Sequence, residues 1–121
     1  MDTRAVQGQL RRFTDERDWQ QFHTPRNLML ALVGEVGELA EVMQWRTDAE
    51  LLALAREPAG REALEDEIAD VLTYLLQLAE ALGVDLDAAV AAKLEKNARK
   101  YPAVLARGSN AKYTELRRPP R

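Results

Sequence analysis

The chain has 121 residues, no cysteine and a formal net charge of −3. This length is enough for one domain with a real core, and the mild charge argues against a general nucleic-acid binder. The absence of cysteine excludes a disulfide scaffold and a thiolate metal site. No apolar run is long enough to span a membrane and no signal-peptide core is present, so we expect a protein of the cytoplasm.

The first half of the chain predicts two helices. Apolar residues at helical spacing predict a first helix over residues 6–16. A polar, ring-rich segment follows and ends in Thr24 and Pro25, which are typical of an N-cap and of a first helical position. We therefore expect a long second helix over residues 25–45.

The middle of the chain predicts two more helices. Thr47 and Glu50 form a capping-box pattern at the start of a short third helix over residues 48–56. The segment 57–60, which contains proline and glycine, predicts a break. The fourth helix is expected over residues 61–82.

A fifth helix is expected to reach residue 100. Gly83 suits the C-terminal cap of the fourth helix, and Asp85 suits the N-cap of the fifth. Pro102 stops this helix, because the residue before a proline disfavours helical geometry. Small apolar residues on several sides of the helix are typical of a buried or an interface helix. We therefore expect a homo-oligomer, although an internal core would produce the same pattern.

The predicted fold class is all-α, because no segment alternates convincingly as a strand. We expect a four-helix bundle-like core plus one short helix. A single helical domain would cover residues 1–105. Residues 106–121 would form an irregular, flexible tail.

Two acidic pairs interrupt the apolar stripes of two predicted helices. With ~100° of rotation per residue, Glu35 falls inside the stripe of the second helix and Glu38 lies at its edge. Glu67 and Asp70 run along one flank of the stripe of the fourth helix. The members of each pair are three residues apart, so they are neighbours on the helix surface.

These acids predict a metal site. A carboxylate on a core-facing stripe is costly unless it is paired, protonated or bound to a metal. If the two helices pack antiparallel, four carboxylates face one another and repel. A bound divalent cation would relieve that repulsion, and an all-oxygen site suits Mg²⁺ or Mn²⁺. Acid pairs at this spacing are also common on solvated helix faces, so either pair alone is weak evidence.

The order Glu-x-x-Glu, then Glu-x-x-Asp, resembles the signature of the all-α nucleotide pyrophosphohydrolases, the MazG-like and dimeric-dUTPase superfamily. Four stretches resemble its dCTP pyrophosphatase branch. They are RDWQQFHTPRNLMLALVGEVGELAEVMQW, EDEIADVLTYL, AAKLEKNARKYPA and AKYTEL. The resemblance covers residues 10–116, which is nearly the whole chain.

The resemblance implies a Mg²⁺-dependent hydrolase that converts a nucleoside triphosphate and water into the monophosphate and pyrophosphate. Its catalytic and metal-binding residues would be Glu35, Glu38, Glu67 and Asp70. One of these carboxylates could also orient or deprotonate the attacking water. The resemblance further implies a homo-oligomer, usually a tetramer, whose active sites are completed across subunits. No nucleic-acid polymer is expected as a partner.

Recognition of a base requires flat apolar walls and a few polar groups. Trp19, Trp45 and Tyr74 are candidate walls, and His23 is a candidate polar contact or second wall. Trp45 directly follows the second helix, and Tyr74 is one turn beyond Asp70. Each ring could equally belong to the core. The resemblance implies a pocket for cytosine, with dCTP and modified dCTPs as substrates in the house-cleaning of the nucleotide pool.

The resemblance also implies phosphate contacts near the end of the fifth helix. The residues concerned are Lys93, Asn97, Lys100 and Tyr101. Lys93 and Asn97 are four residues apart and share a helix face. Ordinary solvent-exposed lysines are the alternative interpretation.

Three other interpretations compete with this one. A di-iron carboxylate bundle requires Glu-x-x-His motifs, and we reject it because His23, the only histidine, lies outside the acid-bearing helices. A non-enzymatic helical interaction module explains the apolar helices but not the acids beside their stripes. A related all-α hydrolase acting on dUTP or on a damaged purine triphosphate stays within the enzyme class.

Overall fold

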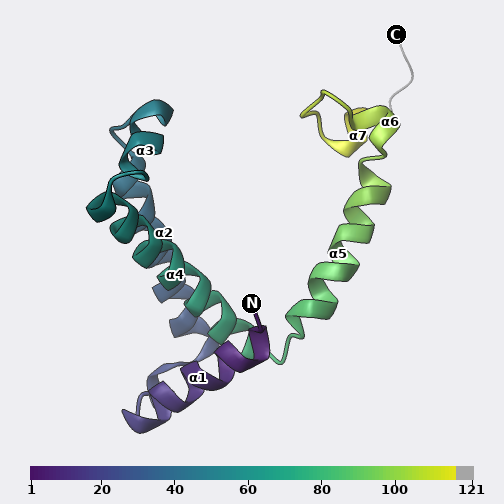
Figure 1. The fold of residues 1–121 in the computed structure, drawn as a ribbon. Coiled ribbons are helices and arrows are strands. Elements are labelled where there is room, and N and C mark those ends of the chain that lie inside the picture. Colours follow the sequence, from purple (N-terminus) through teal and green to yellow (C-terminus); the bar gives the residue numbers. More distant parts are fainter. Residues whose placement is uncertain (117–121) are drawn as a thin grey trace. The chain divides into compact units, whose positions relative to one another are not determined.

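The structure is a computed structural model that describes residues 1–116. It contains helices and no strand within those residues, so the predicted all-α class is confirmed. In chain order the elements are α1 (Thr3–Glu16), the 3₁₀ helix η1 (Gln20–Phe22), α2 (Pro25–Met43), α3 (Asp48–Leu54), α4 (Pro58–Ala81), α5 (Leu86–Lys100), α6 (Ala103–Ala106) and α7 (Tyr113–Leu116) (Figure 1).

The chain forms two compact units, Met1–Val84 and a second unit that begins at Asp85. The second unit contains α5 and the single-turn helices α6 and α7. The predicted single domain over residues 1–105 stays a prediction. The end of the predicted tail, residues 117–121, lies outside the described residues.

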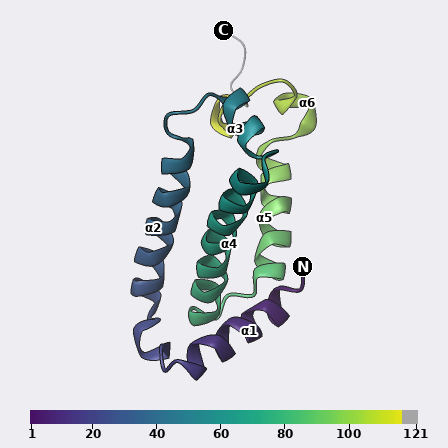
Figure 2. The same ribbon diagram turned by 60° about the vertical axis from the view of Figure 1, so that its left-hand side comes forward.

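Helices α2 and α4 form the centre of the first unit. They run side by side in opposite directions, as both Figure 1 and Figure 2 show. Helix α1 crosses the C-terminal part of α4, where the Gln7 side-chain amide donates to the carbonyl oxygen of Leu76 at 2.9 Å. This antiparallel pair is the arrangement that the acid pattern required.

The fully buried apolar residues lie at one end of the helix pair. Leu28 and Leu32 of α2 and Leu76 and Ala79 of α4 are buried, with Leu76 only 2 % exposed. Burial of a leucine side chain contributes about 1.5–3 kcal/mol. The acidic residues lie further along the same two helices, beyond this core.

Side-chain caps fix the starts of α2, α3 and α5. The Thr24 hydroxyl accepts from the Asn27 amide at 3.3 Å, and the Thr47 hydroxyl accepts from the Glu50 amide at 3.2 Å. The Asp85 carboxylate accepts from the Ala88 amide at 3.1 Å. Each such cap is worth about 1 kcal/mol. These three N-caps are as predicted from the sequence.

The boundary of α4 differs from the prediction. The helix begins at Pro58, three residues before the expected start, because proline suits the first helical position. Gly60 is therefore inside the first turn, where it lies against Leu54 of α3. Other ends also differ from the prediction. Helix α2 ends at Met43, before Trp45, and α3 ends at Leu54, two residues early. Helix α1 already begins at Thr3, after the cap formed by Asp2.

The C-terminal end of α4 follows the prediction. Gly83 has φ +68°, a left-handed conformation that glycine adopts without a steric penalty. The amide of Val84 donates to the carbonyl oxygen of Ala79 at 2.8 Å, which is typical of such a helix end.

Candidate functional site

Three of the four predicted acids meet between α2 and α4. Carboxylate oxygens of Glu35, Glu38 and Glu67 all lie within 4.8 Å of one another. Glu35 and Glu38 are one turn apart on α2, and Glu67 reaches them from the neighbouring helix. The register of the helix pair therefore assembles an all-oxygen cluster from residues that are about thirty positions apart in sequence.

Two oxygens of this cluster lack partners. Oε2 of Glu35 and Oε2 of Glu67 are buried and accept no hydrogen bond from the described residues. A buried polar atom without a partner costs about 1–3 kcal/mol, and more when it carries charge. Both atoms require either a proton or a cation.

The pKa values of the cluster also indicate a need for a proton or a cation. Burial raises the pKa of Glu35, and a hydrogen bond to Glu38 and its charge raise this pKa further, with smaller contributions from Asp70 and Glu67. Burial also raises the pKa of Glu67, followed by the charges of Glu38 and Asp70. The carboxylates therefore resist ionising together, which a cation would relieve.

Asp70 lies beside the cluster and is not one of its three closest members. Its side chain is exposed, but its charge raises the pKa values of both Glu35 and Glu67. Asp70 is one turn after Glu67 on α4. The structure thus groups three predicted ligands tightly and places the fourth at the edge.

These residues fit a hard divalent cation. The donors are all carboxylate oxygens, which such ions prefer, and two of them are buried and unsatisfied. Cysteine is absent and the only histidine lies outside the cluster, so softer ligands do not compete.

The candidate aromatic residues lie in different surroundings. Trp45 stands in the turn after α2 and is 85 % exposed, so it does not belong to the core of this unit. Tyr74 is half-buried on α4, one turn beyond Asp70. The Trp19 ring lies 6.4 Å from the ring of His23, centroid to centroid.

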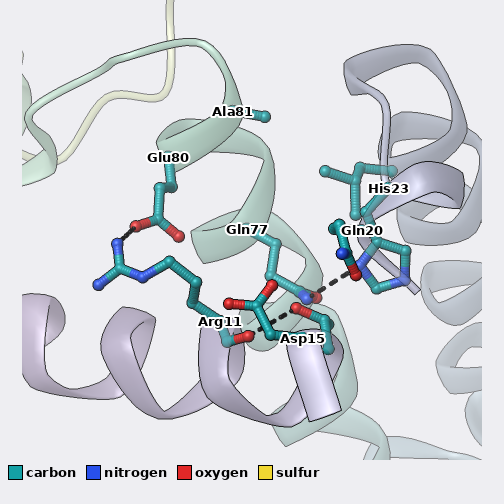
Figure 3. A pocket seen from close by; sticks show the side chains of 9 residues that line it. Arg11, Asp15, Gln20, His23, Gln77, Glu80 and Ala81 are labelled. Atoms are coloured by element: carbon teal, nitrogen blue, oxygen red, sulfur yellow. Dashed lines mark hydrogen bonds and ion pairs between the residues drawn. The ribbon is translucent and has the colours of Figure 1, made fainter. Parts of the chain in front are cut away.

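A cavity of about 400 Å³ lies between α1, η1 and the C-terminal part of α4 (Figure 3). Its lining residues are Arg11, Thr14, Asp15, Gln20, His23, Leu28, Gln77, Glu80 and Ala81. Arg11 and Glu80 form an ion pair across it. Seven of the nine lining residues have polar or charged side chains, and His23 is the one predicted substrate-binding residue among them.

The helix register fixes how far this cavity lies from the acids. Gln77 follows Asp70 by seven residues on α4, and Leu28 precedes Glu35 by seven residues on α2. At about 1.5 Å per residue, each separation is roughly 10 Å along the helix axis. The cavity and the acid cluster thus lie about two turns apart along one helix pair.

The sequence did not predict the polar residues of this cavity. Gln77 and Glu80 lie on the same helix as the predicted ligands, but nothing in their spacing distinguishes them from solvated residues. The signal comes from contacts that only the fold creates: Gln77 meets His23, 54 positions away, and Glu80 meets Arg11, 69 positions away.

The residues predicted to contact phosphates belong to the second unit. Lys93 and Asn97 are one turn apart on α5, and Lys100 and Tyr101 mark its end. Asn97 and Lys100 are half-buried, whereas Lys93 is exposed. Their role in substrate binding stays a prediction.

A family model described as MazG-like matches residues 31–116, and the chain therefore belongs to the MazG-like family. The resemblance deduced from the acid motif is confirmed. The matched region contains the four predicted acids, Trp45, Tyr74 and the predicted phosphate-contact residues.

Known proteins resemble the chain over most of its length. The human protein dCTP pyrophosphatase 1 is 59% identical over 104 residues, 86% of this chain and 61% of the human protein. The rat protein of the same name is 57% identical over 106 residues, 88% of this chain and 62% of its own length. The chain thus spans 61–62% of the length of these relatives.

A solved structure has the same fold. A pyrophosphatase from Archaeoglobus fulgidus superposes with a TM-score of 0.75 at 41% identity, covering 84% of this chain and 94% of that one. The helical arrangement that assembles the acids is therefore also found in a protein whose structure was solved by crystallography.

Proposed function

We propose that this protein is a Mg²⁺-dependent nucleoside triphosphate pyrophosphohydrolase that converts dCTP and modified dCTPs into the monophosphate and pyrophosphate. The observation that carries the proposal is the cluster of Glu35, Glu38 and Glu67, with its two buried and unsatisfied oxygens. The names of the relatives, at 57–59% identity, support dCTP as the substrate.

The four acids are proposed to hold the cation. Glu35, Glu38 and Glu67 supply oxygens from the cluster, and Asp70 adds a carboxylate from its edge. When bound, Mg²⁺ (or Mn²⁺) neutralises phosphate charge and orients the triphosphate for in-line attack. Without it, the negative charge of the cluster would repel the substrate.

The reaction needs a water molecule placed opposite the leaving group. The water oxygen bonds to the α-phosphorus, the bond from that phosphorus to the bridging oxygen breaks, and pyrophosphate leaves. A carboxylate oxygen of the cluster would accept the proton of the water. The same carboxylate would also orient the water, because the helix that carries it holds its side chain in place.

Recognition of the nucleotide is assigned to residues outside the cluster. Trp19, Trp45 and Tyr74 would provide flat walls for the base, and His23 a polar contact. The phosphates would be met by basic and polar side chains of the second unit, namely Lys93, Asn97, Lys100 and Tyr101. Several of these residues are expected to reach a site in a partner subunit.

The assembly is proposed to be a homo-oligomer, usually a tetramer in the family that the sequence resembles. Apolar side chains exposed on α2 and α4 support this proposal, since single protomers rarely leave such stripes open. We also propose a cytoplasmic location. Within residues 1–116, none of the helices combines the length and the apolar character needed to cross a membrane.

Product analysis tests the proposed function. Purified protein is incubated with a panel of nucleoside triphosphates, first with Mg²⁺ and then with EDTA. We expect monophosphate and pyrophosphate to form only with Mg²⁺, and to form fastest from dCTP. A preference for dUTP or a damaged purine would keep the reaction and change the substrate, whereas no hydrolysis of any nucleotide would favour an interaction module.

A further inference from the structure

His23 is held by a side chain that the proposed function does not use. Its Nδ1 atom lies 3.3 Å from Nε2 of Gln77 on α4, and Figure 3 shows this contact at the wall of the cavity. Trp19 flanks the same ring at 6.4 Å. The imidazole is therefore fixed by two residues from different elements.

The contact also fixes where the ring carries its proton. Nε2 of Gln77, which faces the ring in this orientation of the amide, can only donate a hydrogen bond, so Nδ1 of His23 accepts it. In a neutral imidazole that accepts at Nδ1, the proton resides on Nε2. Nε2 is then a hydrogen-bond donor.

We propose that Gln77 is a positioning residue that holds His23 as the tautomer with its proton on Nε2, so that Nε2 donates to an acceptor atom of the bound nucleotide. This role rests on the proposed function and extends it, because it names the residue that determines whether Nε2 of His23 donates or accepts. The cavity beside both side chains is about 400 Å³, which leaves room for part of a ligand. Acceptor atoms occur on a pyrimidine base, at a carbonyl oxygen or ring nitrogen, and on the phosphates.

Two variants test the tautomer. Gln77→Leu removes the donor while keeping the size of the side chain, and Gln77→Glu offers only an acceptor when it is ionised. Because His23 is the only histidine, one pair of ring ¹⁵N resonances reports its state directly. At alkaline pH we expect the Nε2–H form in the wild type, a mixture of tautomers in Gln77→Leu and a shift towards the Nδ1–H form in Gln77→Glu.

Kinetics with dCTP and dUTP test the role. In Gln77→Leu only part of the population would carry the proton on Nε2, so the KM should rise by roughly twofold to fivefold with little change in kcat. Gln77→Glu should be worse than Gln77→Leu, because Nε2 then presents a lone pair to an acceptor. A larger effect on dCTP than on dUTP would assign the acceptor to N3 of the cytosine ring, because N3 of uracil carries a proton and cannot accept. Equal effects would assign it to O2 of the base or to the phosphates, which both nucleotides share.

Gln7→Leu is the matched control. Gln7 also joins α1 to α4 by one side-chain hydrogen bond but does not contact His23. It should lower stability like Gln77→Leu and leave KM and the ring resonances unchanged. A wild-type ring in the Nδ1–H form, or an unchanged KM in Gln77→Leu, would overturn the proposal. If the wild type hydrolyses no nucleotide, the proposed function and the substrate contact fail together, while the ring resonances still decide whether Gln77 sets the tautomer.

Discussion

Oε2 of Glu35 and Oε2 of Glu67 define the chemistry of the site at the scale of single residues. Each is buried without a hydrogen-bond donor, and each belongs to a side chain whose pKa is raised. An isolated cluster of this kind destabilises the fold, because carboxylates that face one another repel. The cluster therefore lowers the free energy of unfolding when no cation is bound, and this decrease can be measured.

The metal-free protein should lose stability as the pH rises above about 4.5. The ordinary pKa of both Glu35 and Glu67 is 4.5, and the folded state raises it. The folded state therefore keeps protons that the unfolded chain releases, so the free energy of unfolding falls as the pH rises through the raised pKa values. Urea titrations with EDTA from about pH 5 to about pH 8, compared with a Glu35→Gln/Glu67→Gln variant, measure this slope. Equal slopes for the two proteins would contradict the pKa assignment.

Replacing Glu38 should separate stability from activity. Glu38→Gln removes a charge that raises the pKa values of both Glu35 and Glu67, so the metal-free fold should become more stable. Turnover should fall by about a hundredfold or more, because a proposed cation ligand is lost. Thermal melts with and without Mg²⁺ and initial rates check the two effects.

Glu41→Gln is the comparison variant for this experiment. It makes the same change of charge one turn further along α2, at an exposed residue outside the cluster. Its activity and its response to Mg²⁺ should match those of the wild type. Wild-type turnover in Glu38→Gln would refute the metal-site assignment.

At the scale of elements, one helix start depends on a glycine. A Cβ on Gly60 would lie 2.5 Å from both Cδ1 and the carbonyl oxygen of Leu54, so the first turn of α4 can approach α3 only without a side chain. Gly60→Ala should destabilise the first unit by about 1–3 kcal/mol. Gly8→Ala in α1 should instead be neutral or stabilising by up to about 1 kcal/mol, since its Cβ would meet only flexible arginine ends at 3.6 Å or more. Chemical denaturation of both variants compares them, and equal stabilities would contradict the close approach.

The same glycine illustrates what the sequence could predict about the elements. Caps such as Thr24 and Asp85 are local, because donor and acceptor are three residues apart, and the sequence places them correctly. The sequence predicts a break at Gly60, whereas the structure has the first turn of α4 there. The contact between Gly60 and Leu54 depends on how α3 packs against α4, which local sequence does not reveal. The apolar pattern predicts a second helix that reaches Trp45, but α2 stops at Met43.

The candidate site likewise contains some contacts that the sequence predicts and others that it does not. Helical periodicity brings Glu35 and Glu38 to one face and predicts that Glu67 lies opposite, which the structure shows. The hydrogen bond between Gln77 and His23 has no such pattern, because it joins the residue after η1 to α4 across 54 positions. Spacing within a helix can be predicted from sequence, whereas the partner of a polar side chain across elements requires the fold.

At the scale of the whole molecule, apolar residues remain exposed on the central helices. Ile68, Leu72 and Leu75 repeat at i, i+4 and i+7 on α4 and are 53%, 38% and 43% exposed. Met29 and Val33 leave α2 similarly open. Scattered apolar residues are normal on a surface, but stripes at helical spacing favour contact with another protein chain. A second copy of this chain is the partner that we propose.

The wild type should therefore be a homo-oligomer, and Ile68→Lys should dissociate it. A lysine at the first position of the α4 stripe would bury a charge against apolar side chains in the assembly, which costs several kcal/mol. Light scattering after size-exclusion chromatography measures the mass, and circular dichroism checks that the helices persist. Leu52→Lys on α3, where the native leucine is 62% exposed, is the matched control and should keep the wild-type mass. If active sites are completed across subunits, the dissociated variant should lose turnover although Glu35, Glu38 and Glu67 are intact. A monomeric wild type would contradict the assembly, and a monomeric variant with full turnover would show that one protomer contains the whole site.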